Sequence, residues 1–303
     1  MRNQLSNSLV DLANEYQNLL LLTGDHGYAL FDRYRELFPS RYLNCGIAEQ
    51  NMVGMAAGLA RSGFIPIVYG LSAFIPIRVL EQMKIDVCHD LLPVIFLGDG
   101  AGFVYSTLGT SHQSTEDIAA VRAIPNLDIY SPADSFEMKW TMNLAIKKVK
   151  PSYVRIGKSD IGNIHLEDLP DEHEKSMFMV RKGVSDVVFL ATGSMVKTAI
   201  KIADHLRDIS VYSVPRIKPF NENLLIKTLS KKRAVVCFEE HSIYGGFGGM
   251  IAELVANYMP VKILRIGVND RFSEKCGSYQ YLLKEHGLDF AAVLNQVQKF
   301  LRF

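Results

Sequence analysis

Short runs of apolar residues alternate along most of the chain with longer stretches in which apolar residues recur every three or four positions. Runs such as 93–97 are apolar on both faces, which is typical of buried parallel strands, and the longer stretches have the period of amphipathic helices. In the first half, the pattern predicts helix 3–18, strands 19–22 and 41–44, helix 47–61, strand 65–69, helix 73–88, strand 93–97, helix 114–123, strand 127–130, helix 132–148 and strand 152–156.

Residues 161–180 interrupt this alternation, because they are mostly polar, acidic in the middle and interrupted by a proline. We interpret them as a linker between domains. After the linker, the pattern predicts strand 186–191, helix 194–207, strand 210–214, helix 221–230, strand 234–238, helix 247–257, strand 261–266 and two closing helices near 278–285 and 289–300. The expected fold class is therefore α/β, with two doubly wound α/β domains (1–160 and 181–303) and mostly parallel sheets.

Composition narrows the classes of partner. The chain has 303 residues, and its 33 Lys and Arg against 32 Asp and Glu give a formal net charge of +1. This balance gives no electrostatic reason to expect nucleic acid or an anionic membrane as a partner. No apolar run of about 18 residues occurs, so we expect no membrane span. The cysteines lie far apart, which argues against a disulfide framework or zinc site and favours a cytoplasmic protein: Cys45, Cys88, Cys237 and Cys276.

Polar residues gather where the predicted strands of the first domain end. Asp25 and His26 follow the first strand, residues 44–46 and 70–72 follow two others, and the long loop 98–113 carries His112. In open α/β sheets, ligands bind beyond the carboxyl ends of the strands. We therefore expect a binding site at this edge of the sheet.

Glu49 is the most unusual residue of the predicted helices. It shares a helix face with Met52, Val53 and Ala56, so its carboxylate lies on an apolar stripe. Such a carboxylate should either be paired or have its pKa raised by desolvation. The glycines and alanines of residues 54–60 predict close packing against other backbone. The alternative is that Glu49 is only a first-turn residue favoured by the helix dipole.

Several segments resemble the transketolase family of thiamine-diphosphate enzymes. The resemblance to its pyrimidine-binding domain rests on four segments in the family's order: 46–52 (GIAEQNM), 109–116 (GTSHQSTE), 122–126 (RAIPN) and 131–134 (SPAD). Residues 191–194 (ATGS) and 238–246 (FEEHSIYGG) resemble the family's C-terminal domain. The resemblance covers essentially the whole chain but only the later half of a full transketolase, as in the second of the two subunits of a split transketolase.

The resemblance implies roles for residues near the cofactor. Thiamine diphosphate must lose the proton at its thiazolium C2, and its own aminopyrimidine removes that proton when a carboxyl group bonds the ring nitrogen N1′. By resemblance, Glu49 is this catalytic carboxyl. Phe74 corresponds to the aromatic residue that stacks on the pyrimidine ring, and Arg78 is expected to approach the cofactor.

The resemblance also suggests substrate contacts. His112 matches the family's histidine that contacts the donor sugar, which suits an imidazole near neutral pH. Arg155 resembles the arginine that holds a substrate phosphate, and His26 is a further candidate for substrate contact. Leu108 stands where the family usually has an acidic residue that reads sugar stereochemistry, so the donor and acceptor sugars stay open.

The metal site is expected on another chain. Residues 98–100 (GDG) and Asn126 imitate the family's Mg²⁺ and diphosphate motif, but Leu127 replaces its second asparagine. We therefore predict no metal ligand here. Thiamine diphosphate should be shared with an N-terminal transketolase subunit that holds Mg²⁺. This chain should form a homodimer within an α2β2 heterotetramer and be inactive alone.

The predicted function is transfer of a two-carbon ketol unit between sugars, phosphorylated or otherwise activated. One alternative is the beta subunit of the decarboxylating component of a 2-oxoacid dehydrogenase. Another is a condensation like that of deoxyxylulose-phosphate synthase. A third alternative is a catalytically silent scaffold or regulatory subunit, against which the retention of Glu49 argues.

Overall fold

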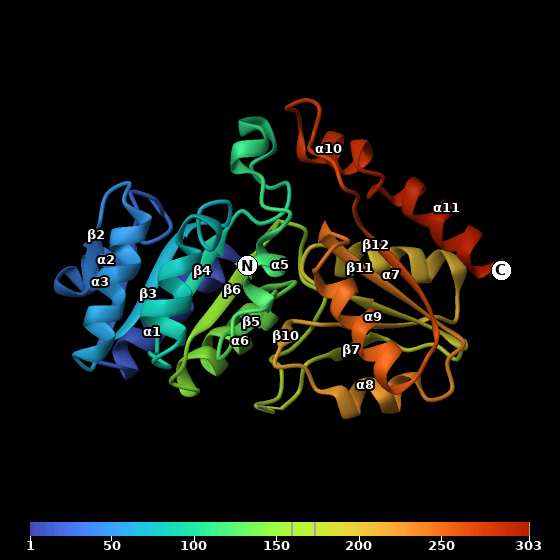
Figure 1. Ribbon diagram of the computed structural model, residues 1–303, viewed down its shortest axis with the longest axis horizontal. Helices are drawn as coiled ribbons and strands as arrows, with labels where there is room; N and C mark the ends of the chain where they lie inside the picture. The colour runs from blue at the N-terminus through green and yellow to red at the C-terminus, as the bar shows by residue number, and fades with distance from the viewer. Residues whose placement is uncertain (159, 173, 303) are drawn as a thin grey trace.

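The computed structural model describes residues 1–158, 160–172 and 174–302. These residues form two sheets that lie side by side, one of seven strands and one of five (Figure 1). The first has the order β10-β5-β6-β4-β3-β1-β2, and the second has the order β12-β11-β8-β9-β7. The strands are β1 (Leu19–Thr23), β2 (Tyr42–Asn44), β3 (Ile65–Leu71), β4 (Ile95–Asp99), β5 (Asp128–Tyr130), β6 (Ser152–Ile156), β7 (Phe178–Arg181), β8 (Val187–Ala191), β9 (Ser210–Ser213), β10 (Arg216–Lys218), β11 (Ala234–Ser242) and β12 (Lys262–Val268).

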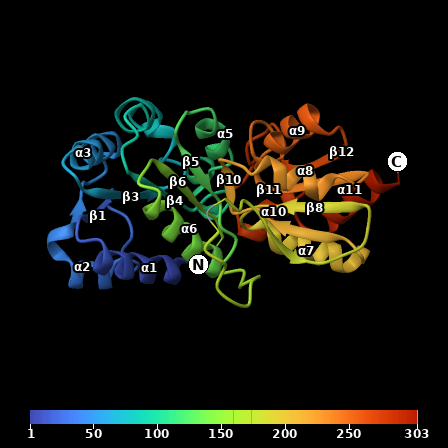
Figure 2. The same cartoon turned by 90° about the horizontal axis from the view of Figure 1, so that it is seen from below.

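Neighbouring strands run parallel except at two edges, where β10 pairs with β5 and β7 pairs with β9 in antiparallel fashion. Helices cover both faces of each sheet (Figure 2). The helices are α1 (Arg2–Glu15), α2 (Asp32–Leu37), α3 (Glu49–Arg61), α4 (Leu80–Gln82), α5 (Asp117–Arg122), α6 (Ser135–Lys147), α7 (Met195–Leu206), α8 (Glu222–Leu229), α9 (Phe247–Tyr258), α10 (Tyr279–Glu285) and α11 (Phe290–Leu301). The predicted α/β class with two mostly parallel, doubly wound sheets is confirmed.

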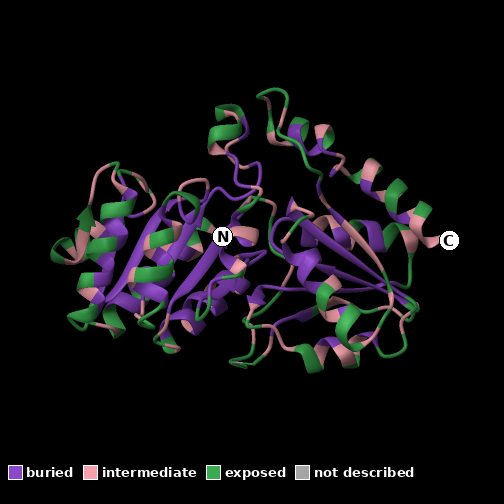
Figure 3. Cartoon of the chain, viewed as in Figure 1, coloured by how far each residue is buried: buried purple, intermediate pink, exposed green. Residues whose placement is uncertain are grey.

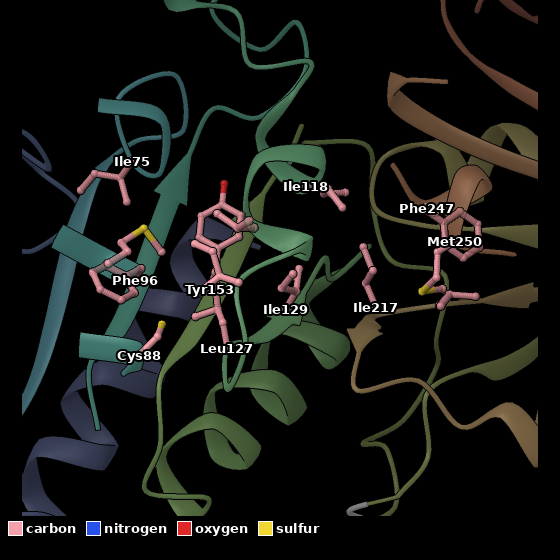
Figure 4. Packing of buried hydrophobic residues seen from close by; sticks show 14 of the residues in the cluster. Ile75, Cys88, Phe96, Ile118, Leu127, Ile129, Tyr153, Ile217, Phe247 and Met250 are labelled. Carbon is pink, nitrogen blue, oxygen red and sulfur yellow. The ribbon is translucent and has the colours of Figure 1, made fainter. Parts of the chain in front are cut away.

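The central strands, such as β1 and β4, are buried on both faces, as their continuous apolar runs predict, whereas the edge strand β2 is partly exposed (Figure 3). Leu19 and Leu21 of β1 pack on the side of α1, α2 and α6, whereas Leu20 and Leu22 pack on the side of α3. The second of these cores continues into the other sheet, where it includes Phe247 and neighbouring residues of α9 (Figure 4). One apolar core thus spans both halves of the chain.

The predicted division of the chain into domains is crossed at two places. Strand β7 begins at Phe178, inside the predicted linker 161–180, of which residue 173 lies outside the described residues. Strand β10, from the predicted second domain, is the edge strand of the first sheet. The periodicity missed β7, β10 and the short helix α2, because elements of three to six residues are too short to show a period.

Three predicted helices begin at other residues or are not continuous. The stretch 73–88 is not one α-helix but a 3-10 turn (Ile77–Val79), α4 and a π-helical turn (Met83–Cys88). Helix α5 begins at Asp117 and not at residue 114, because Ser114 pairs with Gly102 in an isolated antiparallel bridge. Helix α6 begins after Asp134, whose carboxylate caps it by accepting a hydrogen bond from the Glu137 amide at 2.9 Å.

Candidate active site

Glu49 is the first residue of α3 and is buried, with 2% of its surface exposed. Its Oε2 accepts a hydrogen bond from Arg78 Nη1 at 2.9 Å. Its Oε1 has no hydrogen-bond partner within the described residues. An unsatisfied buried polar atom costs about 1–3 kcal/mol, so its retention indicates a site where a ligand supplies the hydrogen-bond partner. Glu49 is therefore both a first-turn residue and a paired carboxylate, and it keeps one oxygen open.

Aromatic and basic side chains surround this carboxylate. The Arg78 guanidinium lies 4.0 Å from the centre of the Phe74 ring. The His112 ring meets Phe74 edge-on, with 5.4 Å between ring centres, and the His26 ring lies 6.5 Å from it. The structure therefore brings together five of the six predicted site residues around a half-buried phenyl ring.

The topology explains this convergence. His26 follows β1, Phe74 follows β3, Glu49 follows β2, and His112 lies in the long loop after β4. These four strands are neighbours in the order β4-β3-β1-β2 and run parallel, so their carboxyl ends share one edge of the sheet. This is the edge at which ligands bind in open α/β sheets.

Asn44 fixes the His26 loop relative to the start of α3, a role that the sequence did not reveal. Its Oδ1 accepts hydrogen bonds from the Asp25 amide at 3.1 Å and from the Gly46 amide at 3.0 Å. Asp25 also accepts from Tyr28 and from the Asn44 side-chain amide, and these bonds lower the pKa of Asp25. Gly46 has a φ of +70°, which glycine adopts without strain. An exposed asparagine at a strand end carries no sequence signal that separates it from other loop residues.

Arg155 does not lie with the other five residues, and the prediction that it binds a substrate phosphate is not supported. Its guanidinium is 2% exposed and is held by both oxygens of Asp117, at 3.0 and 2.9 Å. It also donates to the backbone carbonyls of Ser114 and Glu240, at 3.3 and 2.8 Å. The position at the end of β6 was predicted correctly, but the second sheet covers that end and the protein itself supplies the anion.

Asp117 joins Arg155 to the edge of the first sheet where the five candidate site residues lie. It accepts hydrogen bonds from Tyr153 at 2.8 Å and from Ser72 at 3.3 Å, and Ser72 lies two residues before Phe74. Ser72 also donates to the Ser114 hydroxyl at 2.9 Å. All of these hydrogen-bonding groups are buried. They form a network whose members are far apart in the chain, so no local motif indicated it.

Three titratable side chains of β11, Glu239, Glu240 and His241, are buried where the second sheet meets the first domain. Burial raises the pKa of Glu239 to about 8, although its carboxylate accepts from the amides of Phe247 and Gly248. Burial lowers the pKa of His241 to about 4, since the fully buried imidazolium would lose its hydration. Glu240 accepts from the Phe103 amide at 2.7 Å, which ties β11 to the loop that carries His112.

The residues that imitate a Mg²⁺ motif serve other purposes. Asp99, at the end of β4, accepts hydrogen bonds from Tyr69 at 2.7 Å and Tyr105 at 3.3 Å. Asn126 donates its amide to the Cys88 carbonyl at 3.1 Å. The two side chains therefore have separate partners. Within the described residues, no three His, Cys, Asp or Glu side chains are grouped so that they could hold a metal ion.

The expectation of close backbone packing at the glycines of α3 is wrong. A Cβ atom at Gly54 or Gly58 would meet nothing within 4 Å. The buried face of α3 is formed instead by its methionine, valine and alanine side chains. The glycines lie on the outer face beside Ile47 and Met55, which are 77% and 39% exposed.

Family comparisons match both halves of the chain. The transketolase pyrimidine-binding domain matches residues 1–163, and the transketolase C-terminal domain matches residues 178–293. The chain is 34% identical to a putative transketolase C-terminal section of Methanocaldococcus jannaschii, over 100% of this chain and 96% of that protein. It is 32% identical to a subunit of the apulose-4-phosphate transketolase of Actinobacillus succinogenes, over 85% of this chain and 84% of the relative. It is also 32% identical to the 6-deoxy-6-sulfo-D-fructose transketolase subunit SqwH of a Clostridium species, over 94% of this chain and 90% of that protein.

Solved structures agree with these matches. A structure described as a split gene transketolase, inactive beta4 tetramer, superposes with a TM-score of 0.90 at 32% identity, over 99% of this chain and 98% of that chain. A transketolase mutant from Pichia stipitis, 17% identical, shares the fold with a TM-score of 0.84. The match covers 100% of this chain but only 46% of the Pichia stipitis chain.

Two mostly parallel α/β sheets, the first with a buried glutamate where its strands end, are the fold of a thiamine-dependent family to which both halves of the chain match. The chain belongs to the transketolase family and corresponds to the pyrimidine-binding and C-terminal domains of its members. Among the described residues, no helix is both long and apolar enough to span a membrane.

Proposed function

We propose that this chain is the pyrimidine-binding subunit of a split transketolase, which transfers a two-carbon ketol unit between sugars with thiamine diphosphate. The observation that carries the proposal is the open Oε1 of buried Glu49, whose partner Arg78 lies over the ring of Phe74. An aminopyrimidine fits these residues, because it offers a ring nitrogen to a carboxyl group and a flat face to a phenyl ring. When bound, the cofactor supplies a nucleophilic carbon and an electron sink.

The chain's own residues have distinct tasks in this proposal. Glu49 holds a proton at Oε1 for the pyrimidine nitrogen, and Arg78 occupies Oε2 so that only one oxygen is free. Burial strengthens the shared hydrogen bond, because water does not compete for it. Phe74 positions the ring, and His26 and His112 present imidazole nitrogens to the oxygens of a sugar.

A partner chain is the second part of the proposal. We infer that an N-terminal transketolase subunit holds the diphosphate and Mg²⁺, in a heterotetramer with a homodimer of this chain. Two relatives are named as subunits of transketolases, and one structural relative is described as a split gene transketolase in an inactive beta4 tetramer. The residues clustered around Phe74 would form one half of the cofactor site, here called the half-site. Three exposed apolar side chains lie near it in the chain, Ile47, Ile77 and Ile85, with exposed fractions of 77%, 37% and 52%. The four cysteines are free thiols, which fits a cytoplasmic enzyme.

The test compares the purified chain with its mixture with the N-terminal subunit. The donors are a panel of ketose phosphates and a sulfonated ketose, which includes the sugars named for the two relatives, apulose 4-phosphate and 6-deoxy-6-sulfo-D-fructose. We expect ketol transfer to an aldose only in the mixture, and tight, Mg²⁺-dependent binding of thiamine diphosphate by calorimetry only there. Tight binding and transfer by the chain alone would refute the split site. Release of CO₂ from a 2-oxoacid without transfer to an aldose would favour the dehydrogenase subunit.

A further inference from the structure

The loop that carries His112 leaves the first domain and lies against the C-terminal domain (Figure 1). It contains two 3-10 turns, Ser106–Leu108 and Thr110–His112, and it packs beside the segment 269–278 that follows β12. The Gly277 amide donates to the Ser106 carbonyl at 3.4 Å. A Cβ atom at Gly109 would lie 3.1 Å from Cys276 Sγ, so the two segments are in contact.

A buried chain of hydrogen bonds joins this loop to the C-terminal domain next to His112. Gln113 is 6% exposed, and its Oε1 accepts from Ser273 Oγ at 2.7 Å across 160 residues of sequence. Ser273 Oγ also contacts His286 Nε2 at 3.0 Å. The His286 ring stacks on Phe103 with 4.7 Å between ring centres and 23° between planes. His286 therefore contacts both ends of the His112 loop, directly at Phe103 and through Ser273 at Gln113.

Gln113 determines where the protons lie in this series of hydrogen bonds. Gln113 Oε1 can only accept, so the single hydroxyl proton of Ser273 points toward it. The Ser273 oxygen then accepts from His286, which must carry its proton on Nε2. Burial lowers the pKa of His286, so the neutral ring is the form at neutral pH. His286 Nδ1 accordingly carries no proton, and it has no hydrogen-bond partner within the described residues.

We propose that Ser273 and His286 of the C-terminal domain are positioning residues for His112, acting through Gln113. They hold the loop so that the His112 ring keeps its edge-on contact with Phe74 and faces a bound sugar. This inference rests on the proposed function for the sugar contact. The tether itself is independent of that function.

The first test measures amide hydrogen exchange in the chain alone, for peptides that cover residues 104–113. Ser273→Ala removes the middle of the hydrogen-bond chain, and we expect faster exchange in those peptides. Ser278→Ala is the matched control, since Ser278 lies in the same segment and its hydroxyl accepts from the Tyr281 amide, a hydrogen bond that caps α10 and does not involve the loop. Equal exchange in the two variants, at the wild-type rate, would overturn the tether.

The second test is a double-mutant cycle in the complex with the N-terminal subunit, using the ketose of the panel that the wild-type complex uses best. We expect Ser273→Ala to lower kcat/KM for the donor by roughly twofold to tenfold, as for one lost hydrogen bond. Its affinity for thiamine diphosphate should not change. In a His112→Ala background, the same substitution should have almost no further effect. An equal loss in both backgrounds would overturn the proposal, whereas an inactive wild-type complex would instead refute the proposed function.

Discussion

Replacing Glu49 by glutamine removes a proton-sharing oxygen and changes little else. The amide keeps the size of the side chain. In the wild-type chain, Arg78 donates to Glu49 Oε2 at 2.9 Å, and the amide oxygen of glutamine can accept the same hydrogen bond. The NH2 group that then stands at the position of Oε1 can donate a hydrogen bond, but it cannot transfer its proton to a ring nitrogen and take it back. Positioned proton transfer contributes about 10²–10⁴-fold to rates, so we expect kcat of the complex to fall by this factor. This corresponds to about 3–5 kcal/mol in the activation free energy.

The structure also predicts what Glu49→Gln leaves unchanged. The ion pair with Arg78 is screened, because 44% of the arginine side chain is exposed. The free energy of unfolding should therefore change by less than about 1 kcal/mol. Glu81→Gln, on the exposed surface of α4, is the matched control and should keep full activity. Steady-state assays of the complex and urea unfolding of the chain measure both quantities. Near-native turnover in Glu49→Gln would refute the assignment of the catalytic carboxyl.

Further predictions concern the site and its supports. His112→Ala should lower kcat/KM for the donor by roughly tenfold or less and leave cofactor affinity unchanged in calorimetry; unchanged donor kinetics would return His112 to an ordinary loop residue. Gly102→Ala should destabilise the chain by more than about 2 kcal/mol in urea unfolding, because Gly102 has a φ of +70° and its Cβ would meet Glu240 Oε1. Gly54→Ala, with open space around its Cβ, should instead stabilise the isolated chain by about 1 kcal/mol. His241 binds its proton near pH 6.5 when unfolded but only near 4 when folded, so stability should be lost as the pH falls through this interval, by about 3 kcal/mol. Urea unfolding of His241→Gln should lack this part of the pH dependence, and an unchanged dependence would contradict the burial argument.

The clustering of His26, Glu49 and His112 was predictable because these residues belong to local segments at strand ends, whereas Phe74 and Arg78 were proposed from the family resemblance. Glu49 stands out within one helix, and His26, Phe74 and His112 each follow a strand. Once the sheet order is set, parallel strands bring those ends together without further information. The predicted elements of the core were correct for the same reason, since a continuous apolar run is a property of the strand itself.

The errors concern contacts that no local segment contains. Arg155 ends a strand in the expected way, but whether its guanidinium meets solvent or Asp117 depends on how the second sheet covers it. Strand β10 is three residues long, and its pairing with β5 is a non-local antiparallel contact. Gly54 and Gly58 led to the expectation of close packing on α3, but composition does not say that this face is open within the chain.

Contacts between the two domains show what the C-terminal domain contributes to the site, although all five clustered residues lie in the first domain. The loop that carries His112 is held at Phe103 by Glu240 and at Gln113 by Ser273, and both partners come from the second domain. The segment that carries Phe74 is held at Ser72 by Asp117, whose carboxylate is oriented by Arg155, and Arg155 also bonds the Glu240 carbonyl. Each of these side chains is buried or partly buried, so the orientation does not depend on groups exchanging with water. The first domain therefore supplies the candidate site residues, and the second domain supplies contacts that hold their loops.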